Sequence, residues 1–194
     1  MINEDITLEN DRVMLVALKS EHITELLEYS INQPDLWEFS LTRGDGEENL
    51  RNYIQMALNQ RKAGTSYPFI VFDKKNGKFA GSTRFYDYQK HHNTVQLGYT
   101  WYGKEFQRTG LNRNCKLLLL SYAFEELKLN RVEFRADAKN KRSIIAMKAI
   151  GCTEEGILRQ NCSSPEGRRD SIILSILNSE WKDVKPRLID KIYG

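Results

Sequence analysis

The chain has 194 residues, with 29 Lys and Arg against 26 Asp and Glu, which gives a formal charge of +3. So small a charge does not by itself indicate a nucleic acid or an anionic membrane as partner. The apolar share of 40% and the aromatic share of 10% argue against a disordered chain. We therefore expect one domain with its own core over residues 1–194.

The sequence shows no sign of export or of membrane insertion. No apolar run approaches the roughly 18 residues that a membrane-spanning helix needs, and the first ten residues are acidic and polar, unlike a secretory signal. The three cysteines, Cys115, Cys152 and Cys162, are far apart and odd in number, which argues against a disulfide framework or a zinc site. We expect a cytoplasmic protein without a metal ion.

Helices and strands alternate along the chain, as in a layered α/β or α+β fold. An Asn76-Gly77 pair between two apolar runs is typical of a β-hairpin. The first half is expected to begin with a strand at 13–17 and a helix from Ser20 onward. A second helix is expected from about Leu50 to Lys62, with a stop at Gly64. Three strands are then expected at 68–73, 78–86 and 94–101.

The second half continues with helices and strands in alternation. Apolar residues at Leu111, Cys115, Leu118 and Tyr122 predict a helix to about Leu127. Pro186 should kink or restart the closing helix. The remaining expected elements are a strand at 131–136, a helix from an Asn140 cap to Gly151, two strands at 153–161 and 169–177 around a turn at 163–167, and the closing helix around 181–188.

The most informative stretch is the loop before the central helix, where a strand ends and Gly110 precedes the helix. The first turn of a helix carries free N–H groups and the positive end of the helix dipole. Arg108 and Arg113 add positive charge nearby, so the loop has the properties of a pyrophosphate cradle. It matches neither the Rossmann fingerprint nor the P-loop. An ordinary strand-to-helix turn remains the alternative.

The pattern Q-x-x-G-x-(G/A), carried by Gln107, Gly110 and Asn112, resembles the acetyl-CoA-binding motif of the GNAT superfamily of N-acetyltransferases. The chain also resembles the RimJ/RimL-type branch of this superfamily, which includes ribosomal-protein N-terminal acetyltransferases. The matching segments are residues 122–125, 129–132, 140–143 and 155–159. The resemblance implies the GNAT fold, an α/β (α+β) architecture with a mixed twisted sheet. Its central strands splay apart, helices flank it, and acetyl-CoA lies between the splayed strands.

The resemblance also implies residue roles. The pyrophosphate would lie on the loop and the pantetheine would pair with the preceding strand, while Ser143 would reprotonate the coenzyme A thiolate. Lys139, Lys141 and Arg142 would contact the phosphates or only form a solvated helix start. The implied cofactor residues are Leu97, Tyr99, Thr100, Trp101, Gln107, Arg108, Thr109, Gly110, Leu111, Asn112, Asn140, Arg142 and Ser143.

The acceptor side is less defined. Walls for the acceptor are implied at Trp37, Phe39, Phe85 and Tyr86, although core packing explains each of them as well. Near the start of a late strand, Arg168, Arg169 and Asp170 would hold an acceptor peptide or form exposed ion pairs.

The chain departs from the family pattern where a general base or acid is common. Gln96 replaces an acidic residue, Met147 replaces a tyrosine and Asn112 replaces Gly or Ala, while residues 158–162 carry no Glu or His. Asp87 and Glu133 are candidate relays or solvated surface carboxylates. At pH 7 roughly 14% of an α-amine is neutral, against roughly 0.04% of a lysine amine. A site without a strong base therefore favours an α-amine.

These observations predict an acetyl-CoA-dependent N-acetyltransferase that acts by direct transfer on a primary amine, first of all a protein or peptide α-amino group. A small-molecule amine is the alternative acceptor, and a coenzyme A-binding sensor with weak or lost catalysis is the alternative class. We expect no direct nucleic-acid partner and no membrane. A homodimer through the late strands is suggested by analogy alone.

Overall fold

The computed structural model describes residues 4–164 and 167–194, so residues 1–3 of the N-terminal segment and 165–166 of the expected turn lie outside the described part. The described strands form one mixed sheet in the order β1-β2-β3-β4-β5-β6-β8-β7. All neighbouring pairs are antiparallel except β5 and β6. The strands are β1 Thr7–Glu9, β2 Val13–Ala17, β3 Ser66–Asp73, β4 Lys78–Gln89, β5 Thr94–Tyr102, β6 Arg131–Asp137, β7 Thr153–Ser164 and β8 Gly167–Leu177.

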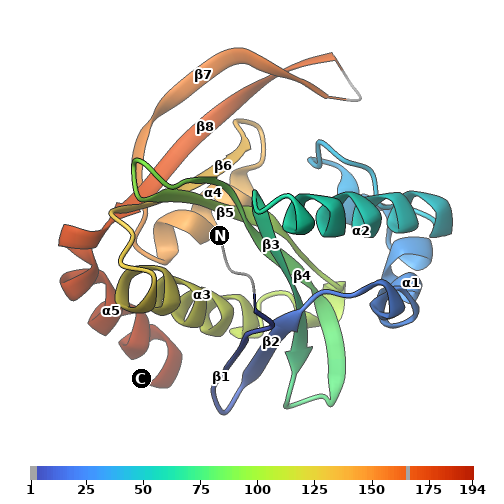
Figure 1. The fold of residues 1–194 in the computed structure, drawn as a ribbon, viewed down its shortest axis with the longest axis horizontal. Coiled ribbons are helices and arrows are strands. Elements are labelled where there is room, and N and C mark those ends of the chain that lie inside the picture. Colours follow the sequence, from blue (N-terminus) through green and yellow to red (C-terminus); the bar gives the residue numbers. More distant parts are fainter. Residues whose placement is uncertain (1–3, 165–166) are drawn as a thin grey trace.

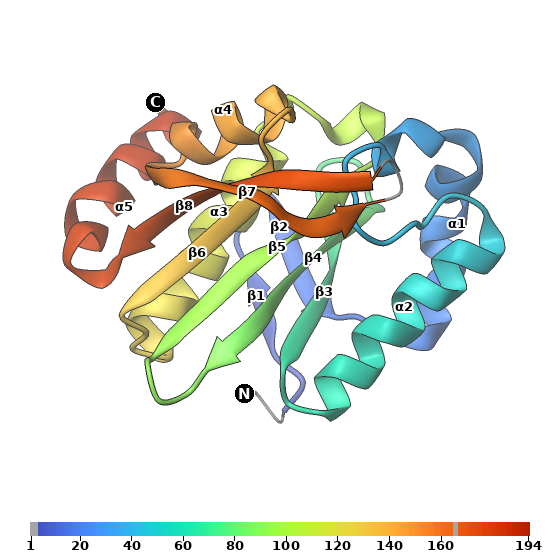
Figure 2. The ribbon, with the colours of Figure 1, turned by 90° about the horizontal axis from the view of Figure 1, so that it is seen from above.

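Helices cover both faces of the sheet. The helices α1 and α2 lie on one side, while α3 and α5 lie on the other, next to α4 (Figures 1 and 2). No helix of residues 4–164 and 167–194 is both long and apolar enough to cross a bilayer. The helices are α1 Ile23–Asn32, α2 Glu47–Lys62, α3 Leu111–Ser121, α4 Lys141–Ala149 and α5 Asn178–Tyr193.

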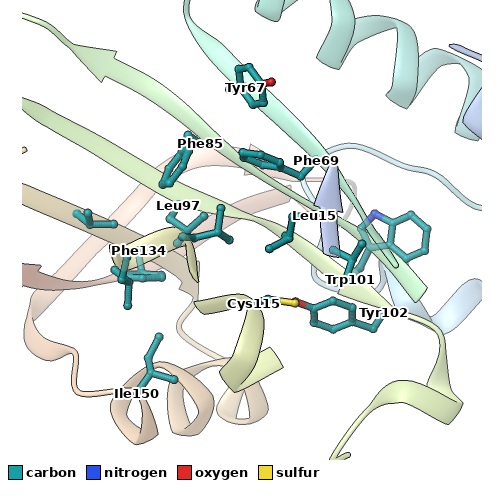
Figure 3. Packing of buried hydrophobic residues seen from close by; sticks show 14 of the residues in the cluster. Leu15, Tyr67, Phe69, Phe85, Leu97, Trp101, Tyr102, Cys115, Phe134 and Ile150 are labelled. Atoms are coloured by element: carbon teal, nitrogen blue, oxygen red, sulfur yellow. The ribbon is translucent and has the colours of Figure 1, made fainter. Parts of the chain in front are cut away.

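Buried side chains form one core on the face that α3 covers and continue beneath α1 and α2. Adjacent strand residues point to opposite faces, so Trp101 and Tyr102 of β5 enter different parts of this core (Figure 3). Tyr102 lies beside Cys115 of α3, whereas the Trp101 ring centroid lies 4.9 Å from that of Trp37. The strand β5 is therefore held from both faces.

The α/β fold and the order of the predicted elements are confirmed, with three corrections. The expected order lacked β1, a short strand of three residues. The expected restart of the closing helix at Pro186 is wrong, because α5 runs through that position without a break, while a kink there stays a prediction. The central helix ends its α-helical part at Ser121 and continues as a π-helical turn, Tyr122–Glu126.

The central strands β5 and β6 pair over three residues and then separate. The last pair joins Gln96 to Glu133, so the rest of β5 has no partner in β6. We call this region, residues 97–102 of β5 and 134–137 of β6, the strand divergence. On its other edge β5 carries an extra residue against β4, and Tyr99 adopts a φ of +50°. This bulge bends the strand at the divergence.

Candidate functional site

The loop between β5 and α3 opens onto the strand divergence. Gly110 adopts a φ of +86° just before α3, and a methyl group placed on it would meet no atom within 4 Å. The first helical N–H with an acceptor belongs to Asn114, which donates to the Gly110 carbonyl at 3.2 Å. The preceding N–H groups are the free donors of a helix start. An anion can therefore approach this backbone closely.

The start of α4 lies against the same loop. Arg142 Nη1 donates to Gln107 Oε1 at 3.1 Å, and Gln107 Nε2 donates to the Tyr102 carbonyl at 2.9 Å. The predicted Asn140 cap is present, because its Oδ1 accepts the Ser143 N–H at 3.0 Å. The fold thus brings together two segments that are far apart in the sequence. Exposed Arg108 and Arg142 give this place positive charge.

Asn112, which stands where the motif has a small residue, is held away from the loop surface. Its Oδ1 accepts the Tyr102 hydroxyl at 3.2 Å, which directs the side chain toward β5. The N–H groups of the helix start are therefore left unobstructed, and the larger side chain is compatible with a cradle.

The turn between β1 and β2 fastens the far side of the loop. Arg12 forms an ion pair with fully buried Asp73, and its Nη2 donates to Thr109 Oγ1 at 3.5 Å. Asn10 donates to Asn114 Oδ1 at 2.9 Å, and Asn114 Nδ2 donates to the Gly110 carbonyl at 3.1 Å. These contacts were not expected from the sequence, because the turn and the loop are far apart along the chain.

A buried lysine behind the strand divergence was also missed. Lys116 of α3 is 5% exposed, and its Nζ donates to Thr100 Oγ1 at 2.8 Å and to Thr83 Oγ1 at 3.4 Å. The two threonine hydroxyls are 2.7 Å apart. Burial lowers the pKa of Lys116 from 10.5 to about 8. The sequence signal for its burial was helical spacing, because Lys116 lies on the same helix face as the buried Leu119, Leu120 and Ala123.

Replacing Lys116 by methionine is expected to raise the free energy of unfolding at neutral pH. The unfolded chain binds the lysine proton up to about pH 10.4, whereas the folded protein releases it near pH 8. The free energy of unfolding therefore rises with pH between about 8 and about 10.4. Below about pH 8 the folded protein keeps the buried ammonium and is destabilised by its full cost. With about 1.4 kcal/mol per pKa unit, that cost is roughly 3 kcal/mol. Urea unfolding at about pH 7 and about pH 10 measures it.

The variant Lys182→Met, at an exposed position of α5, is the control for this change. It should alter stability little at either pH, while Lys116→Met should also flatten the rise in stability above about pH 8. The threonine hydroxyls keep each other as partners, so the methionine leaves neither without a hydrogen bond. If Lys116→Met is less stable than the native protein at neutral pH, the ammonium of Lys116 is not uncompensated.

On the opposite face, aromatic rings surround the bulge of β5. Tyr99 lies 4.9 Å from Tyr86 between ring centroids, and the Arg84 guanidinium stacks 3.8 Å from the Tyr99 centroid. Arg84 is fully buried, and its Nε and Nη2 have no hydrogen-bond partner among the described residues. Burial raises the pKa of Tyr86 well above its usual value, so its hydroxyl stays protonated near neutrality.

The expected acceptor walls divide into two groups. Tyr86 and Phe39 are partly exposed, whereas Trp37 is 6% exposed and packs against Tyr53 and Trp101. Phe85 was expected as an acceptor wall, but it packs in the core instead. It is fully buried, 6.0 Å from Phe69 between ring centroids, on the face opposite its neighbour Tyr86.

The late arginines also separate. Arg168 and Asp170 are exposed, but Arg169 is 8% exposed, which corrects the expectation of an exposed ion pair there. Its Nη1 donates to the Phe39 carbonyl at 3.3 Å and its Nε to Ser171 Oγ at 3.2 Å. Strand alternation could have predicted this burial, because Arg169 lies two residues before Ser171 and therefore shares its face of β8. Arg169 ties β8 to the segment after the 3-10 turn at Pro34–Trp37.

The two candidate relay carboxylates have different surroundings. Gln96 Nε2 donates to Asp87 Oδ2 at 2.7 Å, so an exposed carboxylate is connected to the last paired residue of β5. Glu133, on the opposite strand, forms ion pairs with Arg131 at 2.8 Å and with Arg135 at 2.7 Å. Two arginines thus compensate the charge of Glu133, whereas the donors to the Asp87 oxygens are the neutral amides of Gln89 and Gln96.

Comparisons with known proteins identify the class of molecule that carries this site. The family model for the acetyltransferase (GNAT) domain matches residues 12–153. The chain belongs to the GNAT acetyltransferase family and is an N-acetyltransferase, an enzyme of the acyltransferase class.

The "Putative ribosomal N-acetyltransferase YdaF" of Bacillus subtilis is 28% identical over 95% of this chain and 97% of its own length. A crystal structure from T. thermophilus, described as a "putative acetyltransferase", is 31% identical with a TM-score of 0.88 and full coverage of both chains. The ribosomal-protein-S5-alanine acetyltransferase from Vibrio fischeri, 19% identical over 91% of this chain and 99% of its own, shares the fold with a TM-score of 0.74. The resemblance to the GNAT superfamily is confirmed, while the RimJ/RimL-type branch stays a prediction.

Proposed function

We propose that residues 1–194 form one acetyltransferase domain that transfers an acetyl group from acetyl-CoA to a primary amine, with a protein or peptide α-amino group as the first candidate. One observation carries the proposal. The unpaired edge of β5 leads from the strand divergence to a helix start with free N–H groups and two exposed arginines. An extended chain that ends in a pyrophosphate, as coenzyme A does, fits that combination.

The chain's residues divide the work between two ends of the site. Gln107–Asn112 and Arg142 bind the phosphates, and the backbone of residues 97–101 pairs with the pantetheine arm. Acetyl-CoA supplies an activated acetyl thioester. A backbone N–H of β5 beyond the bulge stabilises the negative charge that develops on the carbonyl oxygen. Ser143, beside the loop, donates a hydrogen bond to the departing sulfur.

The acceptor class follows from the missing base. Gln96 and Met147 cannot take a proton, and Glu133 is held by two arginines. A substrate with a sizeable neutral fraction at pH 7, which an α-amine has and a lysine side chain lacks, suits such a site. The name of the YdaF relative supports a ribosomal-protein acceptor. Asp87 would take up the released proton through water.

We expect Ser143→Ala to lower turnover about tenfold, which corresponds to the loss of one hydrogen bond to a developing charge. The affinity for acetyl-CoA should stay unchanged, because Asn140 caps α4 through the Ser143 backbone N–H and the substitution keeps that bond. Steady-state kinetics and calorimetry separate the two quantities. A fall in acetyl-CoA affinity would make Ser143 a binding residue instead.

The proposal as a whole is tested by titrating acetyl-CoA into the protein, followed by thiol-release assays over peptides with free α-amines and over small amines. Binding with release on an amine supports the proposal, and preference for peptides or for small amines decides the acceptor class. Binding without release on any amine would favour a coenzyme A sensor. Absence of binding would overturn the assignment. A homodimer through the late strands and a cytoplasmic location stay predictions.

A further inference from the structure

The ammonium of Lys116 lies between the two separating central strands. Its Nζ is 2.8 Å from Thr100 Oγ1 of β5 and 6.0 Å from the ring centroid of Phe134 of β6. The ladder between these strands ends at Gln96 and Glu133, so both contacts are made beyond the last pair. The amine therefore lies at the strand divergence, on the face that α3 covers.

This cation has no counter-charge in the described part of the chain. An ammonium has three N–H donors, and the residues 4–164 and 167–194 accept two of them, at Thr100 and Thr83. The titratable groups that face it are the thiols of Cys115 on α3 and of Cys152 between α4 and β7. Burial raises their pKa values to about 11 and about 12, so both are neutral near pH 7.

A buried cation of this kind costs stability unless an anion joins it. The protein retains it at the place where, under the proposed function, an acetyl thioester would react. Breaking a thioester delivers an electron pair to sulfur, which creates an anion for the time that the amide forms. The unused N–H donor and the missing counter-charge are both explained if that anion is its partner.

We propose that Lys116 is a catalytic residue for the leaving group, whose ammonium contacts the sulfur of coenzyme A and stabilises the thiolate that forms there. The inference rests on the proposed function. The acceptor nitrogen forms a bond to the carbonyl carbon, the carbon–sulfur bond breaks, and its electron pair remains on sulfur. The thiolate forms an ion pair with the Lys116 ammonium, which keeps its proton, and takes a proton from solvent after coenzyme A leaves. The proton that the acceptor nitrogen loses passes through water to Asp87 and on to solvent.

The charge that stabilises the thiolate is present at neutral pH. A pKa of about 8 leaves Lys116 mostly protonated near pH 7, and a nearby opposite charge favours the thiolate of a thiol whose pKa is about 8.5 when free. A serine hydroxyl ionises only far above neutral pH. Ser143 can therefore stabilise the thiolate by a hydrogen bond, while Lys116 supplies the positive charge.

The first test measures the thiol pKa of coenzyme A bound to the protein, from the ultraviolet absorbance of its thiolate. In the native protein and in Lys182→Met, we expect the bound thiol to ionise about 1 to 3 pH units below the free thiol. In Lys116→Met it should ionise at or above the value of the free thiol. Turnover of Lys116→Met should fall about a hundredfold, the lower end of the loss when one group that stabilises a developing negative charge is removed.

A second measurement uses the unaltered protein, so that a Lys116→Met protein that fails to fold leaves the inference testable. Nuclear magnetic resonance follows the titration of the Lys116 amine in the free protein, with coenzyme A, and with desulfo-coenzyme A, which lacks the sulfur. Coenzyme A should raise the pKa of Lys116 and desulfo-coenzyme A should not. An equal effect of both ligands would overturn the contact with sulfur.

These outcomes separate the inference from the function on which it rests. If coenzyme A binds but its thiol titrates identically in the native and Lys116→Met proteins, Lys116 is structural and the acetyl-CoA assignment stands. If coenzyme A does not bind the native protein, both fall. Equal turnover of Lys116→Met and the native protein would also overturn the catalytic role.

Discussion

Replacing Gly110 by glutamate is expected to abolish acetyl-CoA binding. The substitution adds a carboxylate at the helix start where the phosphates would lie, and like charges near a protein surface repel by several kcal/mol at about 4 Å. Because each 1.4 kcal/mol is tenfold in affinity, we expect a loss of about a hundredfold or more. Calorimetric titration of acetyl-CoA measures it directly.

Two further variants separate charge from backbone strain. Gly110 has a φ of +86°, so any side chain there costs roughly 1–2 kcal/mol, although the space beside it is open. Gly110→Ala carries that strain without the charge and should weaken binding less. Gly77→Glu carries charge and strain, at a φ of +64° and an equally open position in the β3–β4 turn, and should leave binding intact. Unchanged affinity of Gly110→Glu would mean that the phosphates bind elsewhere.

Replacing Arg12 by methionine is expected to lower the free energy of unfolding by about 3–5 kcal/mol, the usual result of removing one partner of a buried ion pair. Asp73 is fully buried, and Arg12 is its ion-pair partner. The Lys75 N–H and Asn76 Nδ2, at 3.0 and 2.7 Å, remain as hydrogen-bond donors but leave the carboxylate uncompensated. Urea unfolding checks the prediction.

A matched control for this variant is Arg51→Met, which breaks an exposed pair with Glu47 four residues earlier in α2. It should change stability by about 0.5 kcal/mol or less. Adding Asp73→Asn to Arg12→Met removes the unpaired charge and should restore part of the loss. An Arg12→Met protein as stable as the Arg51→Met protein would show that water replaces the arginine at Asp73.

The elements and the cradle could be predicted because their signals are local. Helical spacing identified α3, the Asn140 cap identified α4, and a strand, a glycine and a helix in succession identified the loop. Each depends on residues within a few turns of one another. The structure confirms the elements and joins Gln107 to Arg142, while the roles of these residues stay predictions.

The residues that sequence reasoning missed depend on pairing across the fold. Lys116 and Arg84 have buried, unusual surroundings only because α3, β4 and β5 come together around them. The contact of Arg12 with Asp73 needs the register of β2 against β3. Phe85 and Tyr86 were both expected to form acceptor walls, yet they point to opposite faces of β4. Strand alternation alone predicts that only one of two adjacent residues can face the acceptor.

The brief pairing of the central strands has a consequence for engineering. Three residue pairs join the half-sheet β1–β5 to the half-sheet β6–β8, so the angle between the halves depends mainly on the helices that bracket them. The helix α3 contacts β1, β2 and α5, and α5 contacts β8. Positions where α3 packs on α5 and on β2 therefore influence the angle between the halves without lying at the strand divergence. Under the proposed function, variants at these packing positions should shift which acyl groups are accepted.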